Sequence, residues 1–106
     1  MSEAYDLYQQ GRAELRAGRP EQATRLLERA KDLEPEKASI REALGIAYFR
    51  VGRWREAEAE FRKILDLSPV DLHAHLALAR ALERQGRVDE ARKHRKLHEL
   101  LREPPG

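Results

Sequence analysis

The stretch LGIAYFRVGRWREAEAEFRKILDLSP, residues 44–69, contains a pattern of small and large side chains that recurs 34 residues to either side. Its central glycine, Gly52, has counterparts at that spacing in Gly18 and Gly86. The other sets with the same spacing are Ala23, Ala57 and Ala91; Arg19, Arg53 and Arg87; Leu33, Leu67 and Leu101; Gly11 with Gly45; and Pro35 with Pro69. A period of this length indicates stacked units, none of which can bury its apolar face alone.

Apolar residues follow helical spacing in six segments, which glycine and proline separate. Ser2 is the expected N-cap of the first helix, and the glycine at the end of each hairpin's first helix is expected to stop it. Pro35 is expected to open the third helix. Ser68 and Asp71 form a capping-box-like start for a fifth helix over about 70–85, and a last helix is predicted over about 88–102.

The chain has 106 residues, of which 41% are hydrophobic and 38% charged, and its formal net charge is +2. This length suits one domain spanning 1–106. Acidic and basic residues nearly balance, so composition gives no reason to expect a nucleic-acid partner. Without cysteine there is no disulfide or thiol nucleophile. The sequence has no signal-peptide pattern and no run of roughly 18 apolar residues, so we expect a cytoplasmic protein that does not bind membranes.

The central copy resembles the tetratricopeptide repeat (TPR) in seven positions, Leu44, Gly45, Tyr48, Gly52, Ala57, Phe61 and Pro69. The outer copies match less fully, since Gln10 and Glu14 replace Leu and Tyr in the first, and Arg95, His98 and Glu103 replace the aromatic residue, Ala and Pro in the third. The resemblance implies an all-α fold, a right-handed superhelical stack of three antiparallel helix hairpins. The implied repeats cover about 4–37, 38–71 and 72–105.

In such a stack the first helix of each repeat lines a concave groove, and the resemblance implies which of its positions point inward. The partner-binding candidates are Tyr5, Tyr8, Arg12, Arg16, Ile46, Phe49, Arg50, His73, Leu76, Arg80 and Arg84. The remaining inward positions hold Leu15, Ser39, Glu42 and Glu83. Five arginines against two glutamates favour an acidic protein or peptide segment, because guanidinium groups bind carboxylates bidentately.

A second interpretation of the arginines stays open. Arg16, Arg50 and Arg84 lie in the last turns of their predicted helices, where the interaction of a positive charge with the helix dipole contributes about 0.3 to 1 kcal/mol. Some members of the family clamp a C-terminal carboxylate, but the matching positions here hold Tyr8, Arg12, Ala43, His73 and Ala77. Binding of a chaperone tail is therefore not expected.

The histidines suggest no strong metal site. His94 and His98 lie four residues apart on the last helix, a spacing that can place two imidazoles on one metal ion, but no third ligand is near in sequence. We interpret them as solvated or partly packed side chains and expect neither a metal nor a cofactor. His73 and His75 should face different directions on their helix.

Catalysis and nucleic-acid binding also find little support. The sequence has no Gly-rich phosphate loop and few nucleophiles, so an enzyme is not expected. The basic run at 92–96 has no interleaved aromatic residue and is diluted by nearby glutamates, which favours a solvated helix end.

The sequence therefore predicts a non-catalytic protein-protein interaction module or scaffold that binds a partner segment in its concave groove. The alternative is self-assembly into a homo-oligomer, either a dimer or a filament, through the end faces of the stack. In that alternative Leu97, Leu100 and Leu101 of one molecule meet Leu26 or Leu27 of another.

Overall fold

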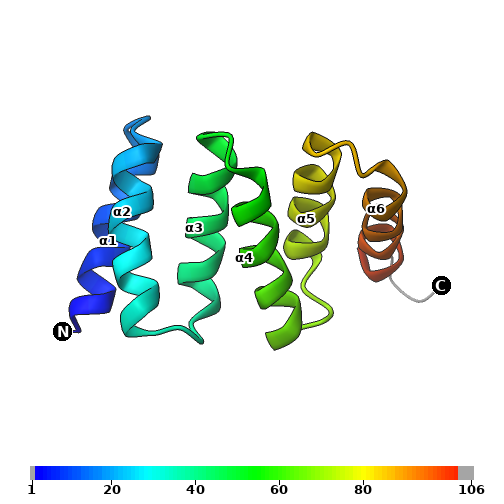
Figure 1. The fold of residues 1–106 in the computed structure, drawn as a ribbon. Helices are drawn as coiled ribbons and strands as arrows, with labels where there is room; N and C mark the ends of the chain where they lie inside the picture. Colours follow the sequence, from blue (N-terminus) through cyan, green and yellow to red (C-terminus); the bar gives the residue numbers. More distant parts are fainter. Residues whose placement is uncertain (1, 103–106) are drawn as a thin grey trace.

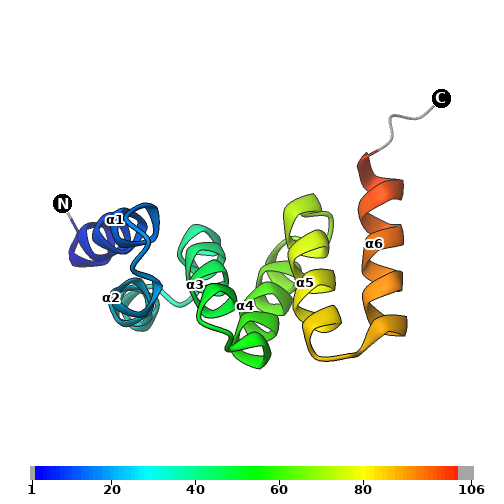
Figure 2. The ribbon, with the colours of Figure 1, turned by 90° about the horizontal axis from the view of Figure 1, so that it is seen from above.

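The computed structural model describes residues 2–102, and that part of the chain consists of helices and short turns. The helices are α1 (Glu3–Arg16), α2 (Pro20–Leu33), α3 (Ala38–Arg50), α4 (Trp54–Leu67), α5 (Leu72–Arg84) and α6 (Val88–Arg102). They form three antiparallel hairpins that stand in a row (Figure 1). Seen from above, α1 lies over α2, whereas α5 lies beside α6, so the hairpins are rotated along the row (Figure 2). The predicted all-α stack of three hairpins is confirmed.

The turn within each hairpin depends on a glycine in a left-handed conformation. Gly18, Gly52 and Gly86 have φ angles of 77°, 82° and 77°, which residues with a side chain rarely adopt. These glycines therefore set the direction in which the second helix of each hairpin returns.

Ser2 caps α1 as predicted, since its Oγ accepts a hydrogen bond from the backbone amide of Tyr5 at 3.0 Å.

Two predicted helix starts are wrong, and both lie next to a proline. The third helix begins at Ala38 rather than Pro35, and the cap of α5 is Asp71 rather than Ser68, because its carboxylate accepts from the amide of Ala74 at 3.0 Å. In each case the proline is the second residue of a β-turn, closed by Lys37 N to Glu34 O at 3.2 Å and Asp71 N to Ser68 O at 3.1 Å. The fixed φ of proline suits that turn position as well as a helix start.

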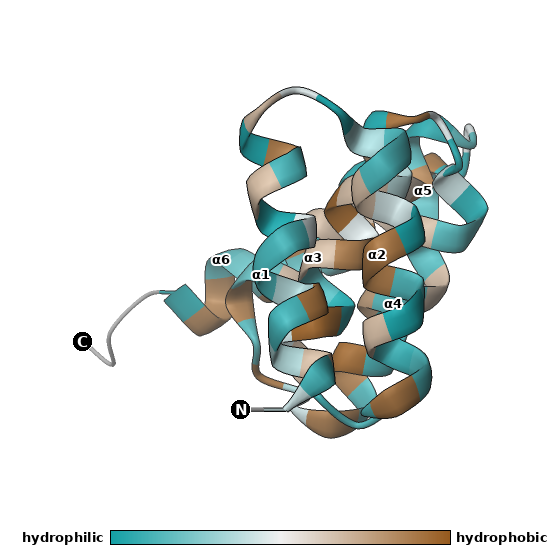
Figure 3. Cartoon of the chain, turned by 90° about the vertical axis from the view of Figure 1, so that its left-hand side faces the viewer, coloured by the Kyte–Doolittle hydropathy of each residue, from teal (hydrophilic) through white to brown (hydrophobic). Residues whose placement is uncertain are grey.

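The core lies between the helices. Along the helices, apolar residues (brown) alternate with hydrophilic ones (teal) in Figure 3. Within the central hairpin, Gly45 lets α4 approach α3 closely. A Cβ atom placed on Gly45 would lie 2.6 Å from Cε1 of Phe61, and one on Gly11 would lie 2.6 Å from Cγ of Leu27. These two glycines thus lie within hairpin contacts.

Two carboxylates of α4 tie the central hairpin to its neighbours, and Glu60 makes the connection to the first. Glu60 is 4% exposed and accepts hydrogen bonds from Arg41 Nη1 at 2.9 Å and from Lys31 Nζ at 3.3 Å. The three residues come from α4, α3 and α2. One buried carboxylate therefore joins three consecutive helices.

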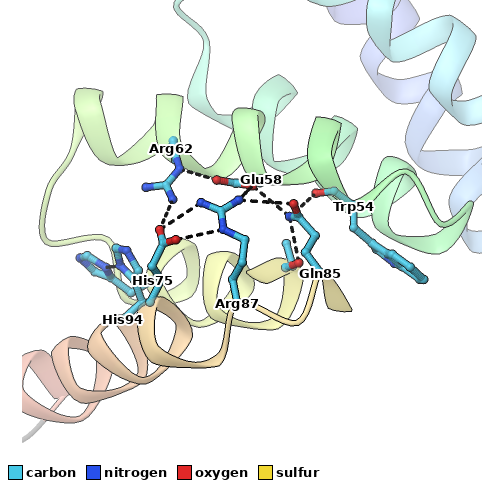
Figure 4. Close-up of polar contacts among 9 residues, drawn as sticks. Trp54, Glu58, Arg62, His75, Gln85, Arg87 and His94 are labelled. Atoms are coloured by element: carbon cyan, nitrogen blue, oxygen red, sulfur yellow. Dashed lines mark hydrogen bonds and ion pairs between the residues drawn. The ribbon is translucent and has the colours of Figure 1, made fainter. Parts of the chain in front are cut away.

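Glu58 makes the connection to the third hairpin (Figure 4). Its carboxylate accepts from Arg62 Nε at 2.8 Å, Arg87 Nη1 at 2.7 Å and Gln85 Nε2 at 2.9 Å. Glu90 binds the same two arginines, at 2.9 Å from Arg87 Nε and 3.2 Å from Arg62 Nη2. Burial opposes ionisation of Glu58, but the hydrogen bonds from Gln85 and Arg62 outweigh it and hold its pKa below the usual value.

A pair of histidines joins α5 to α6 beside this network (Figure 4). Nδ1 of His75 lies 3.1 Å from Nδ1 of His94, and Nε2 of His75 lies 2.8 Å from the carbonyl oxygen of Pro69. A carbonyl only accepts, so Nε2 of His75 carries a proton and its Nδ1 accepts from His94. Burial, followed by the proximity of His75, lowers the pKa of His94.

We expect Glu58→Gln to lower the free energy of unfolding by about 1–2 kcal/mol, because Arg62 and Arg87 would keep their charges and lose the carboxylate between them. Urea unfolding followed by circular dichroism measures the change. The matched control is Glu56→Gln, since Glu56 pairs with Arg53 through side chains that are 46% and 47% exposed. That control should change stability by less than about 0.5 kcal/mol. Equal effects of the two substitutions would contradict the role given to Glu58.

The histidine pair should make the protein less stable as the pH falls. Unfolded His94 takes up a proton near the ordinary value of about 6.5, whereas the folded protein resists protonation until the pH is lower. Its stabilising effect is therefore present above that ordinary value and is lost as the pH falls below it. Arg62 and Lys93 also disfavour the charged form of His94, while Glu90 favours it.

Urea unfolding at about pH 7.5 and about pH 5.5 tests this expectation. The loss of stability between the two should be smaller in His94→Gln than in the unsubstituted protein. His73→Gln is the control, because His73 is exposed and should leave the pH dependence unchanged. A pH dependence that does not differ between the His94 variant and the unsubstituted protein would rule out the role given to this pair.

Candidate partner-binding groove

A pocket of about 360 Å³ lies between α3 and α5. Half-buried Ile46, Leu76 and Ala77 form its walls. Phe61 and Ile64 of α4 reach it from behind, and each is only 2% exposed. The pocket therefore has an apolar floor held in place by the core.

Three polar side chains surround this apolar floor. Glu42 lies in the second turn of α3, His73 in the first turn of α5, and Arg80 two turns further along α5. A second pocket of about 160 Å³ shares Ile46, Phe61, Ala77 and Arg80 with the first and adds Phe49 and Arg50. Six predicted partner-binding residues thus line two adjoining pockets, namely Ile46, Phe49, Arg50, His73, Leu76 and Arg80.

The two predicted tyrosines line a different hollow. Tyr5 and Tyr8 border a pocket of about 230 Å³ that also includes Ser39 and Ile40, near the starts of α1 and α3. Tyr5 is 45% exposed, whereas Tyr8 packs against the core. The guanidinium carbon of Arg12 lies 5.5 Å from the ring centre of Tyr8. The tyrosines are therefore not brought together with the residues between α3 and α5.

The predicted groove arginines have no carboxylate partner within residues 2–102; they are Arg12, Arg16, Arg50, Arg80 and Arg84. Elsewhere in that range, ion pairs involve Arg19, Arg29, Arg41, Arg53, Arg62, Arg87, Arg92 and Arg95. All five groove arginines are exposed. Their charges are therefore accessible to a ligand.

Besides Arg12, which lies over the Tyr8 ring, two of these arginines contact the protein itself. Arg50 Nη1 donates to the carbonyl oxygen of Leu15 at 3.1 Å, so it satisfies the end of α1 rather than that of its own helix. The guanidinium carbon of Arg84 lies 5.7 Å from the ring centre of Phe49 and 5.8 Å from that of Trp54. Arg50 therefore contacts the end of a helix, as in the helix-dipole interpretation, but that helix is α1 rather than α3.

Glu83, although it lies among the inward positions, forms its ion pair with Arg95, and the charge of Arg80 also acts on it. Its two carboxylate oxygens accept from Arg95 Nε at 2.7 Å and Arg95 Nη2 at 2.8 Å. The hydrogen bond from Arg95 lowers the pKa of Glu83. Among the acidic inward positions, this leaves Glu42 facing the pocket.

Sequence analysis missed the pocket floor. Phe61 and Ile64 belong to the second helix of their hairpin, whereas the family pattern assigns groove positions to first helices. Ala74 and Ala77 also line the larger pocket, although their small side chains indicate only helix packing. The signal that could have located the floor is Gly45, since a residue without a side chain there leaves the Phe61 ring room to reach between α3 and α5.

Other predicted surfaces have mixed outcomes. Leu97, Leu100 and Leu101 of α6 are 40%, 60% and 38% exposed. The proposed contact with Leu27 is wrong, because Leu27 is fully buried beneath Gly11, and Leu26 is half-buried.

Within residues 2–102, no three His, Asp or Glu side chains gather as a metal site would require, and His94 meets His75 rather than His98. In that same range no helix has the length and apolar character needed to cross a membrane.

Comparisons with known proteins agree on the fold. A structure described as MamA R50E mutant is 28% identical, with a TM-score of 0.92, over 98% of this chain and 76% of that one. A second structure, MamA AMB-1, is 31% identical, with a TM-score of 0.82, over 86% of this chain and 54% of that one. The second TPR of Spaghetti (RPAP3), bound to the HSP90 peptide SRMEEVD, is 20% identical with a TM-score of 0.88, over 94% and 93% of the two chains.

No curated protein sequence matches the chain. The family model described as tetratricopeptide repeat matches residues 8–69 and again 42–94, in register with the hairpins seen here. Because these matches span most of the chain, it belongs to the tetratricopeptide repeat family.

Proposed function

We propose that this chain is a non-catalytic interaction module that holds an extended, acidic segment of a partner polypeptide against α3 and α5. The observation that carries the proposal is the position of the arginines. Exposed arginines without a carboxylate partner in residues 2–102 adjoin pockets whose floors are apolar. In the free protein these arginines therefore lack a counter-charge, and the apolar walls of the pockets remain in contact with water.

An acidic peptide would satisfy both kinds of group. Guanidinium groups form paired hydrogen bonds with carboxylates, and half-buried apolar walls gain stability when a ligand displaces water from them. An extended segment can reach the adjoining pockets and also Arg84 in the last turn of α5.

One similar structure supports the general mode of binding. The RPAP3 repeat domain holds the peptide SRMEEVD, which contains two glutamates and one aspartate. At 20% identity this likeness establishes a common fold and not a common ligand. That particular peptide is not proposed here, because the positions that match the carboxylate clamp hold Tyr8, Arg12, Ala43, His73 and Ala77.

Peptides selected from a random phage-displayed library on the immobilised protein should be enriched in Asp and Glu. A selected peptide should bind the double variant Arg50→Ala/Arg80→Ala about tenfold more weakly than the unsubstituted protein, because both arginines line the smaller pocket and their charges are lost. Fluorescence anisotropy of the labelled peptide gives both dissociation constants.

The control is the double variant Arg25→Ala/Arg55→Ala. Both arginines are exposed and lack a carboxylate partner in the described residues, but neither lines the pockets between α3 and α5. Equal weakening in the two variants would mean that overall positive charge attracts the peptide, and the groove would not be its site.

Self-association through α6 is a second candidate function. It is favoured by Leu97, Leu100 and Leu101, which are neighbours on the helix surface and remain at least 38% exposed.

If α6 mediates self-association, light scattering coupled to a sizing column should give a molar mass that rises toward that of a dimer with concentration. The double variant Leu97→Glu/Leu100→Glu should stay monomeric, because charged side chains would have to be buried in the contact. Leu33→Glu, at an equally exposed leucine of α2, is the control and should not change the mass. A monomeric mass at every concentration would exclude this candidate.

A further inference from the structure

The two adjoining pockets between α3 and α5, here called the socket, share an apolar floor. Four residues are common to both pockets, Ile46, Phe61, Ala77 and Arg80. The larger pocket has a volume of about 360 Å³, within the range of roughly 300–1,000 Å³ that is typical of ligand sites. The socket is therefore large enough to accept a side chain from a ligand.

The floor of the socket is fixed before any ligand arrives. Phe61 and Ile64 are each 2% exposed, and the Phe61 ring is held against Gly45, where its Cε1 and Cζ atoms occupy the space of a side chain. A preformed apolar hollow loses little conformational entropy when it is filled, and it gains free energy from each apolar group removed from water. The occupant that fits this floor is a bulky apolar side chain.

The charges around the socket differ between its two ends. Glu42 and His73 lie near the starts of α3 and α5, whereas Arg80, Arg50 and the neighbouring Arg84 lie towards the ends of these helices. Arg80 borders both pockets and has no carboxylate partner in the described chain. A carboxylate next to an inserted side chain would therefore be attracted toward Arg80 and repelled by Glu42.

Resting on the function proposed above, we propose that the bound acidic segment inserts one large aliphatic or aromatic side chain into the socket. A carboxylate of an adjacent residue then meets Arg80. The specificity of the module is thus for an apolar residue flanked by acidic ones, and acidic character alone is not sufficient.

Two capped, fluorescein-labelled peptides test the inference directly on the unsubstituted protein. In one, glutamates flank a central leucine, and in the other they flank a central alanine. Because the two carry the same charge, they differ only in what they can place in the socket. The leucine peptide should bind about tenfold more tightly, as expected for burial of most of a leucine side chain.

A variant that fills the socket gives an independent test. Ala77 lines both pockets, so Ala77→Leu should bring the affinity ratio of the leucine and alanine peptides close to one. The matched control Ala77→Ser keeps a small side chain and should retain the preference for leucine. Circular dichroism shows whether both variants are helical. If Ala77→Leu does not fold, the comparison of the two peptides on the unsubstituted protein still decides the question.

The outcomes distinguish this inference from the function beneath it. Equal binding of the leucine and alanine peptides to the unsubstituted protein would overturn the socket inference. If the Arg50→Ala/Arg80→Ala variant still weakened both peptides, binding of acidic segments in the groove would stand. If neither peptide bound the unsubstituted protein, both the function and the inference would fail.

Discussion

The close approach of α3 and α4 at Gly45 is the constraint on which the rest of the molecule depends. Because Gly45 has no side chain, the Phe61 ring lies where a Cβ atom would otherwise be and becomes the floor between α3 and α5. The first hairpin uses Leu27 against Gly11 in the same way, while the third has Arg95 in place of the aromatic residue. Only the central repeat therefore combines a glycine with an aromatic ring, and the apolar pockets lie beside it.

Arginine serves two purposes in this chain. Arg41, Arg62 and Arg87 bind the buried carboxylates of α4, and the pairs Arg87–Glu58 and Arg62–Glu90 join the central hairpin to the third. The predicted groove arginines make no such pairs within residues 2–102, although Arg50 bonds to a carbonyl and Arg84 lies over aromatic rings. The composition, with a net charge of +2, does not reveal this division. Paired and unpaired arginines contribute equally to the net charge and differ only in where they lie in the fold.

Most of the fold could be predicted from the sequence because it depends on local features. Repeated glycines and helical spacing locate the turns and the buried faces, and neither requires knowledge of distant contacts. The starts of α3 and α5 were misplaced because Pro35 and Pro69 suit a β-turn as well as the first turn of a helix. Sequence alone does not distinguish these two uses of proline.

The candidate site was harder to predict because it depends on contacts between separate helices. First-helix positions follow from the repeat register, and six of the predicted partner-binding residues line the socket. Phe61 matches the repeat pattern but is not among the predicted groove positions, and the pairing of His75 with His94 crosses 19 positions, which no spacing rule on one helix can indicate. Those contacts depend on how one helix rotates against the next, and this rotation is a property of the packed hairpin.

The place of Trp54 has a practical consequence. It is the only tryptophan of the chain, and the guanidinium group of Arg84 lies over its indole while also facing Phe49. Any molecule that draws Arg84 away would change the polarity around the indole. The protein thus carries an intrinsic fluorophore beside Arg84, and its emission would report the displacement of that guanidinium group without an attached dye.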